Sequence, residues 1–249
     1  MIGRWLSELP WDGSTQPKSE FSRPLLRRFA HHEEKIKYLE FLGSGGEGVV
    51  YRVTIAGREY AMKIFKKWTY YGPIMKLSER AQPYMSPFSR ECRAFARLHN
   101  MGQNGTWAVK CHGWLKLSEG ELNRFQRRWG RSLSPWAIIK DYIPNPVALA
   151  DVPEIQRKIT IARKARLYPR DCGPENFRGS FLVDLGSVRT YPFPVWNDRC
   201  RRAFFDSFPE HVGEWQESIE DGTVIAGWLN DELKRNREAS AKLEQSGLR

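Results

Sequence analysis

Three polar side chains late in the sequence have the types and spacing of a phosphate-transfer site. Asp171 follows Arg170, Asn176 stands five residues after that aspartate, and Asp184 comes directly after the apolar run 181–183. The first aspartate can accept or orient the proton of an attacking hydroxyl group, while the asparagine and the second aspartate can bind a metal ion that bridges phosphates. Each motif alone would more simply be a turn rich in Asp, Asn and Gly.

A glycine-rich segment in the first quarter of the chain could cover those phosphates. Gly43, Gly45 and Gly48 are spaced so that a loop can bring its backbone N–H groups close to phosphate oxygens, because glycine has no Cβ to obstruct the approach. Val50 follows and could pack against the same ligand. Glycine-rich turns are common, and dinucleotide-binding folds use a similar one. Here a strand rather than a helix is predicted next, at 49–54, which favours a loop within a strand pair.

The second strand of this pair, predicted at 58–65, carries a basic partner for the loop. By two-residue alternation Ala61 and Lys63 share one face. A small residue there suits an adenine ring, and a lysine suits its phosphates. A helix predicted at 89–100 places Glu91 in its first turns, where it can pair with Lys63 and hold it in position. The simpler alternatives are a solvated lysine on a plain hairpin and a surface glutamate paired with neighbouring arginines.

Hydrophobic periodicity predicts an α+β protein, and the length of 249 residues allows one large domain or two small lobes. Residues 1–35 are expected to be an extended N-terminal arm with Trp5 and Trp11 as docking residues, residues 36–143 an antiparallel β lobe with about five strands and one helix, and residues 144–249 a reduced helical lobe. The expected strands are 35–42, 49–54, 58–65, 105–117 and 136–144. The expected helices are 89–100, 122–129, 155–167, a segment around 199–208, and most of 215–247.

The motifs in this order resemble those of protein kinases, over residues 36 to about 190. The resemblance implies a two-lobed protein-kinase-like fold that binds ATP and Mg²⁺ and transfers the γ-phosphoryl group to a protein acceptor. It makes Asp171 the base and places Asn176 and Asp184 on the metal ion. It also places Asp141 at the hinge beside the adenine and Lys140 at the gatekeeper position. A lysine is unusual there; it could reach the phosphates or the acidic pair, or argue against a normal pocket.

Several stretches more narrowly resemble the fungal family described as the kinetochore Sim4-complex subunit (Fta-type) domain. They are residues 41–67, 104–117, 136–144 and 169–192. This resemblance covers most of the chain beyond the arm. It implies a compact, atypical kinase-like domain and a kinetochore complex as the partner.

Departures from the kinase pattern bear on activity. Pro169 replaces the histidine that precedes the Arg-Asp pair, and Gly173 stands where serine/threonine kinases keep a phosphate-steadying lysine. No A-P-E motif follows Asp184, and the residues that remain are too few for a complete substrate-binding lobe. Three interpretations stay open: an atypical ATP-dependent protein kinase, a catalytically weak pseudokinase acting as a structural subunit, and a small-molecule phosphotransferase.

Composition limits the partners and the location. The net charge of +11 permits an acidic partner such as nucleic acid, yet the basic clusters are not interleaved with aromatic residues in a recognisable nucleic-acid motif. The four cysteines lack C-x-x-C spacing, so we expect reduced thiols. No apolar run approaches the length of a membrane span and the N-terminus lacks a signal sequence. We therefore expect an intracellular protein, nuclear or cytoplasmic, with no membrane partner.

Overall fold

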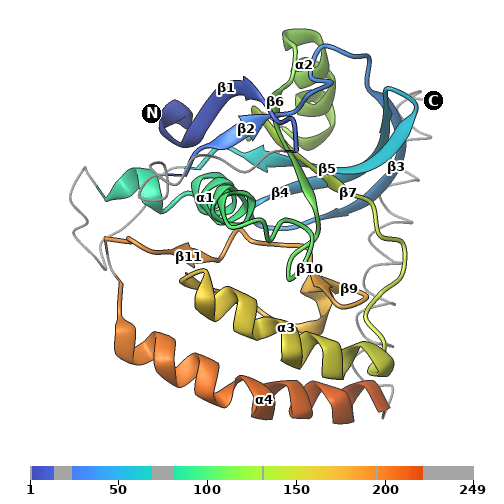
Figure 1. Cartoon of the computed structure of the whole chain (residues 1–249). Helices are drawn as coiled ribbons and strands as arrows, with labels where there is room; N and C mark the ends of the chain where they lie inside the picture. Colours follow the sequence, from blue (N-terminus) through green and yellow to red (C-terminus); the bar gives the residue numbers. More distant parts are fainter. Residues whose placement is uncertain (1, 14–23, 69–80, 131, 195, 221–249) are drawn as a thin grey trace.

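A seven-stranded sheet occupies the upper part of the molecule as drawn in Figure 1. The computed structural model describes residues 2–13, 24–68, 81–130, 132–194 and 196–220. The strands of the sheet are β1 (Leu6–Pro10), β2 (Leu26–Arg28), β3 (Lys37–Ser44), β4 (Gly48–Ile55), β5 (Arg58–Lys66), β6 (Cys111–Lys116) and β7 (Leu133–Asp141). Across the sheet they follow the order β1-β2-β6-β7-β5-β4-β3.

The five antiparallel strands expected from alternation form one continuous part of this sheet, from β6 to β3. β4 and β5 pair along their whole length without a register shift. The turn between them has both residues at positive φ, 49° for Ala56 and 76° for Gly57. That is the backbone of a tight two-residue hairpin, in which glycine is favoured. The unbroken register fixes which β5 side chains face each side of the sheet.

The strand predicted at 105–117 is shorter than expected, because its first half forms a turn. β6 begins only at Cys111. Before it, the Asn104 side chain accepts a hydrogen bond from the Cys111 N–H and donates one to the Cys111 carbonyl oxygen, both at 2.9 Å. Gly105 follows with φ +82°. Asn-Gly favours such a turn, and this local signal outweighs the strand-forming residues that come after it.

The N-terminal arm adds two strands to the sheet that alternation did not predict. β2 pairs in parallel with β6, and β1 pairs in parallel with β2. Trp5 is only 3% exposed, and the Trp11 ring stacks on His99 with ring centroids 4.9 Å apart. A Cβ at Gly113, whose φ is +118°, would overlap the β2 backbone. Glycine at that position therefore permits the close approach of the arm.

The described residues contain four α-helices, each near a predicted one. They are α1 (Pro87–Asn100), α2 (Glu119–Trp129), α3 (Val152–Lys164) and α4 (Asp198–Glu220). α2 begins earlier than the predicted residue 122, because Ser118 and Glu121 form a capping box. α4 continues through Pro209 beyond the predicted residue 208. The helical region predicted at 215–247 lies largely outside the described residues.

The N-terminus of α1 offers a direct test of its cap. Ser86 Oγ accepts a hydrogen bond from the Ser89 N–H at 3.1 Å. We expect Ser86→Ala to lower the free energy of unfolding by about 1 kcal/mol, because one helix N–H loses its acceptor. Ser86→Thr keeps the hydroxyl group and should stay closer to the parent protein. Urea denaturation would measure both variants, and equal stability of the two would contradict the cap.

Hydrophobic side chains pack on both faces of the sheet. One cluster lies between the sheet and α2 and includes Phe125. A larger cluster joins the opposite face to α1, α3 and α4 through residues such as Leu98, Ile155 and Phe208. In Figure 1, α1 lies between the sheet and the lower helices α3 and α4.

This packing decides which β5 residues face the functional site. Met62 and Ile64 are fully buried in the cluster under α2. Ala61 and Lys63 alternate with them and therefore face the other side of the sheet, as the sequence predicted.

Two short strand pairs lie below the sheet. β8 (Leu167–Tyr168) pairs with β11 (Arg189–Thr190), and β9 (Phe177–Arg178) pairs with β10 (Phe181–Leu182). They hold the loops that carry the candidate acidic residues. Within the described part of the chain, no helix has the length and apolar character needed to cross a membrane.

Candidate functional site

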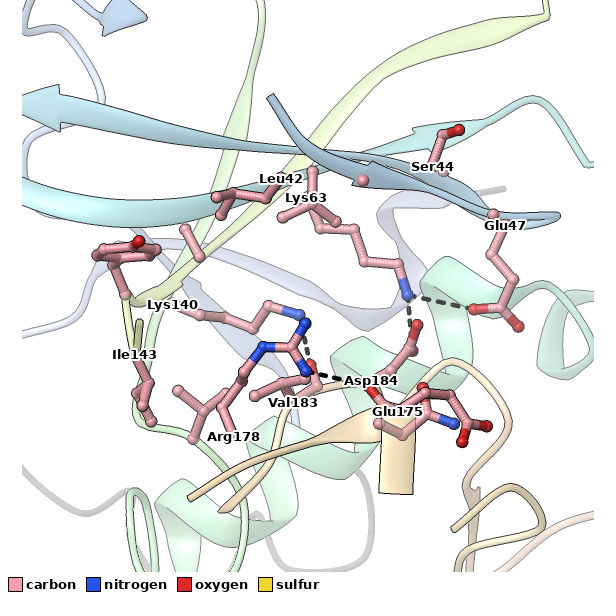
Figure 2. Close-up of a pocket in the computed structure, with 18 of the residues that line it drawn as sticks. Leu42, Ser44, Glu47, Lys63, Lys140, Ile143, Glu175, Arg178, Val183 and Asp184 are labelled. Atoms are coloured by element: carbon pink, nitrogen blue, oxygen red, sulfur yellow. Dashed lines mark hydrogen bonds and ion pairs between the residues drawn. The ribbon is translucent and has the colours of Figure 1, made fainter. Parts of the chain in front are cut away.

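The residues singled out by type and spacing converge on one cavity of about 610 Å³. Figure 2 shows it below the β3–β4 turn, with Lys63 and Asp184 pointing toward each other. The candidate residues that line it are Gly43, Gly45, Gly48, Val50, Ala61, Lys63, Asp141, Asp171, Asn176 and Asp184. Glu91 of α1 lies behind the lining and is fully buried. The fold thus brings together residues far apart in the sequence; the ligand remains a prediction.

Lys63 is the centre of a charge network. Its Nζ donates to Asp184 Oδ1 at 2.7 Å, to Glu91 Oε2 at 2.9 Å and to Glu47 Oε2 at 3.2 Å. Burial alone would lower the pKa of Lys63, but the attraction of Asp184, Glu91 and Glu47 raises it above its usual value. Lys63 therefore stays charged, and each of its three ammonium hydrogens has a carboxylate acceptor.

Glu91 links Lys63 to a second buried lysine. One carboxylate oxygen accepts from Lys63, and the other accepts from Lys140 Nζ at 2.8 Å. Lys140 Nζ also donates to the Val183 carbonyl oxygen at 2.7 Å. The glutamate and both lysines are at most 4% exposed. Among the acidic residues of the network, the structure thus shows a contact of Lys140 with Glu91.

Asp184 is held ionised by its neighbours. Its Oδ1 accepts a hydrogen bond from the Gly186 N–H at 2.8 Å in addition to the one from Lys63. Burial favours the neutral carboxyl group, but Lys63 and Lys140 outweigh it and lower the pKa of Asp184 to about 2.

Stability should therefore fall as the pH drops from about 4 to about 2. A carboxyl group whose pKa is about 2 when folded, below its ordinary 3.8, stabilises the fold above the ordinary pKa. That contribution is lost as the pH falls through the folded value. Asp184→Asn removes the titration, so its free energy of unfolding should change less over the same interval. Urea unfolding across this range measures both slopes, and parallel slopes would contradict the assignment.

Glu47 is a site residue that the sequence analysis did not single out. It lies within the glycine-rich turn, and its side chain points toward Lys63 and Asp184 (Figure 2). A Cβ at Gly186 would overlap the Glu47 carboxylate, so glycine at 186 makes room for it. Burial raises the pKa of Glu47, although Lys63 acts in the opposite direction. The sequence did contain a signal for Glu47, because an acidic residue is unexpected inside a turn predicted to cover phosphates.

The glycines of this turn satisfy different constraints. A Cβ at Gly48 would overlap the Ile64 carbonyl oxygen on β5, so the strand pair itself requires glycine there. Among the residues that the structure describes, no heavy atom lies within 4 Å of a Cβ built on Gly43 or Gly45. Packing of the chain therefore does not account for glycine at these two positions, whereas close approach of a ligand to the backbone would.

Asp171 and Asn176 lie on the opposite side of the cavity, around the 3-10 turn Pro174–Asn176. Asp171 is exposed and Asn176 is half-buried. The Asn176 carbonyl oxygen accepts a hydrogen bond from the Val183 N–H at 2.8 Å. This bond ties the turn to the segment that carries Asp184.

The two residues predicted to bind Mg²⁺ offer few ligands by themselves. Asp184 and Asn176 contribute one carboxylate and one amide group to the lining. Across the residues that the structure describes, no three His, Cys, Asp or Glu side chains form a group that could hold a metal ion. Two protein oxygens suffice for Mg²⁺ when phosphate oxygens and water complete its shell. The residues therefore fit the ion only as part of a phosphate complex.

Asp141, the predicted hinge residue, lines the cavity but has its carboxylate engaged elsewhere. Asp141 Oδ1 accepts from His112 Nε2 at 2.7 Å and from Arg58 at 2.9 Å. Burial raises the pKa of Asp141, but His112 and Arg58 outweigh it and lower the pKa overall. The side chain thus braces three strands of the sheet. Two further lining residues, Glu175 and Arg178, were not singled out by the sequence.

The sheet and the cavity together define a mixed α/β protein with a lysine–carboxylate network beneath a glycine-rich turn. Residues 14–189 match the family described as kinetochore Sim4 complex subunit FTA2. The match covers more than half of the chain and includes every candidate site residue, so the chain belongs to this family. No curated protein matches the chain.

Proposed function

We propose that this chain is a kinetochore-complex subunit that acts as a structural and interaction subunit rather than as a phosphotransferase. Its family is described as a kinetochore Sim4 complex subunit, which supports a protein-complex partner and a nuclear location. The proposal includes a two-lobed, kinase-like arrangement. The sheet with α1 would be one lobe and α3 and α4 the other (Figure 1). Residues of both would line the cavity.

The observation that carries the proposal is that all three ammonium hydrogens of Lys63 are bonded to carboxylates of the protein. In a phosphotransferase of this type the lysine binds phosphate oxygens and one glutamate orients it. Here its Nζ has three carboxylate partners within 3.2 Å. One of them, Glu47, belongs to the turn that would cover the phosphates. Carboxylates of the protein therefore already balance the positive charge of Lys63, which the phosphates of a nucleotide would otherwise balance.

Two sequence departures support the same conclusion. Pro169 cannot supply the ring hydrogen bonds of the histidine that usually precedes the catalytic Arg-Asp pair. Gly173 cannot steady a transferred phosphate, because it has no side chain.

A localisation experiment tests the structural role. Fluorescently tagged parent chain and Asp171→Asn would each replace the resident copy in the native cells. We expect both to concentrate at kinetochores to the same extent, because the role does not depend on a catalytic base. A diffuse signal for the parent chain would contradict the kinetochore assignment, and loss of the focus only in the variant would favour an enzymatic role.

The second candidate is an ATP-dependent phosphotransferase, and the bare surroundings of Gly43 and Gly45 favour it. ATP with Mg²⁺ would supply the phosphoryl group. Lys63 would contact its phosphates, Asp171 would orient the acceptor hydroxyl, and Asn176 and Asp184 would hold the metal ion. This candidate requires Lys63 to exchange a carboxylate partner for phosphate.

Thermal melting with ATP, with and without Mg²⁺, separates the two candidates, because a bound ligand raises the melting temperature by linkage. We expect little Mg²⁺-dependent shift in the parent protein. A shift of several degrees that Asp184→Asn abolishes would support the phosphotransferase instead.

A further inference from the structure

We infer that Glu47 occupies the position of a ligand phosphate group and is the residue that excludes polyphosphate anions from the cavity. The inference deepens the proposed function, on which it rests, because it names the side chain that keeps polyphosphate anions out of the cavity. It also specifies the class of ligand that the cavity would accept without it.

The first step is that Lys63 has no donor to spare. An ammonium group has three N–H donors, and those of Lys63 are directed at Asp184, Glu91 and Glu47. Lys140 donates to Glu91 and to a backbone carbonyl. An anion that binds Lys63 must therefore displace one of its three carboxylates.

The second step is that Glu47 is the partner most easily displaced. Glu91 is fully buried and holds both lysines. Asp184 makes the shortest contact with Lys63, 2.7 Å, and also binds the Gly186 N–H. Glu47 makes the longest of the three contacts with Lys63, 3.2 Å. Its carbonyl oxygen accepts from the Lys66 N–H at 2.8 Å, so the backbone stays anchored while the side chain can rotate.

The third step concerns the charge of the cavity. The carboxylates in the lining are those of Glu40, Glu47, Asp141, Asp171, Glu175 and Asp184, whereas its cations are Lys63, Lys140 and Arg178. Although the whole chain carries a net charge of +11, this cavity has more acids than bases. A polyphosphate is repelled by such a lining. Loss of Glu47 both removes one negative charge and releases one Lys63 donor.

The ligand class follows from the geometry of the turn. Gly43 and Gly45 line the same cavity as Glu47 and Lys63, and among the described residues no heavy atom lies within 4 Å of a Cβ built on either glycine. A chain of phosphates can contact Lys63 and the backbone of these glycines at once. Free polyphosphate and the phosphates of a nucleotide share this chemistry, so the test must separate them.

The test compares parent protein, Glu47→Gln and Glu175→Gln by calorimetric titration with magnesium tripolyphosphate, Mg-ATP and adenosine. Glu47→Gln keeps the volume of the side chain and removes its charge. Glu175→Gln removes the same charge from the same lining, but Glu175 is not among the three carboxylates that hold Lys63. We expect Glu47→Gln to bind tripolyphosphate at least about tenfold more tightly than the parent, and Glu175→Gln to stay within about threefold.

A double variant and a comparison of two ligands test the role of Lys63 and the class of ligand. Adding Lys63→Met to Glu47→Gln should abolish the gain, because the phosphate would lose its cation. A larger gain for Mg-ATP than for tripolyphosphate would identify a nucleotide, and equal gains would identify a phosphate chain alone. If Glu47→Gln fails to fold, Glu47→Asp keeps the charge but shortens the side chain, which weakens its contact with Lys63 and should give a smaller gain.

Equal affinities of parent and Glu47→Gln, or an equal gain in Glu175→Gln, would overturn the inference. These outcomes are distinct from failure of the proposed function. Turnover of Mg-ATP by the parent protein would contradict the structural role while leaving the comparison between Glu47→Gln and Glu175→Gln intact.

Discussion

Glu91→Gln is expected to lower the free energy of unfolding by about 3–5 kcal/mol, the range for removing one partner of a buried ion pair. The glutamate is fully buried and accepts from Lys63 at 2.9 Å and from Lys140 at 2.8 Å. Without its charge, two buried ammonium groups lose their shared counter-charge. Urea denaturation monitored by tryptophan fluorescence measures the change.

Two further variants make this result specific. Glu154→Gln breaks an exposed pair with Arg157 and should cost far less stability, because solvent screens the two charges. Lys140→Met in the Glu91→Gln background removes one uncompensated charge and should restore part of the stability. A cost below about 1 kcal/mol for Glu91→Gln would show that the network does not hold the fold together.

Gly48→Ala is expected to destabilise the protein by about 1–3 kcal/mol, because the added methyl group would overlap the Ile64 carbonyl oxygen. β4 would then have to move away from β5 at the end nearest the cavity. Gly45→Ala is the matched control: the same methyl group meets no heavy atom within 4 Å, so stability should change by less than about 0.5 kcal/mol.

The pair separates a glycine that the fold requires from one that a ligand would require. Chemical denaturation of both variants tests whether the fold requires glycine at position 48 but not at position 45. Equal destabilisation by the two substitutions would contradict the packing difference between them. In the Glu47→Gln background, Gly45→Ala should weaken tripolyphosphate binding, since the methyl group lies where the phosphates would approach the backbone.

The alternation of apolar and polar residues and the turn residues predicted the secondary structure best where the signal lay within a few neighbouring residues. The β4–β5 hairpin matches the strand pair predicted at 49–54 and 58–65, on either side of Ala56 and Gly57. The two N-terminal strands could not be predicted in this way. β2 has only three residues, and parallel pairing with β6 depends on close approach at Gly113, which no period in the sequence reveals.

The sequence likewise predicted which residues line the candidate site, but not the direction of every side chain in it. Motif order was enough to place Lys63, Asp171 and Asp184 around one cavity. It did not show that Glu47 points inward, because the direction of a side chain in a turn depends on the room left by a distant residue, here Gly186. The family match confirms the resemblance to the kinetochore Sim4 complex subunits. ATP and Mg²⁺ binding remain predictions.

Phosphate release from Mg-ATP tests the central claim most directly. The initial rate would be measured for the parent protein and for Asp171→Asn, with and without Mg²⁺. Because Lys63 already has its three carboxylate partners, the account predicts no difference between the two proteins and no dependence on Mg²⁺. Faster, Mg²⁺-dependent release by the parent protein, lost in Asp171→Asn, would contradict it.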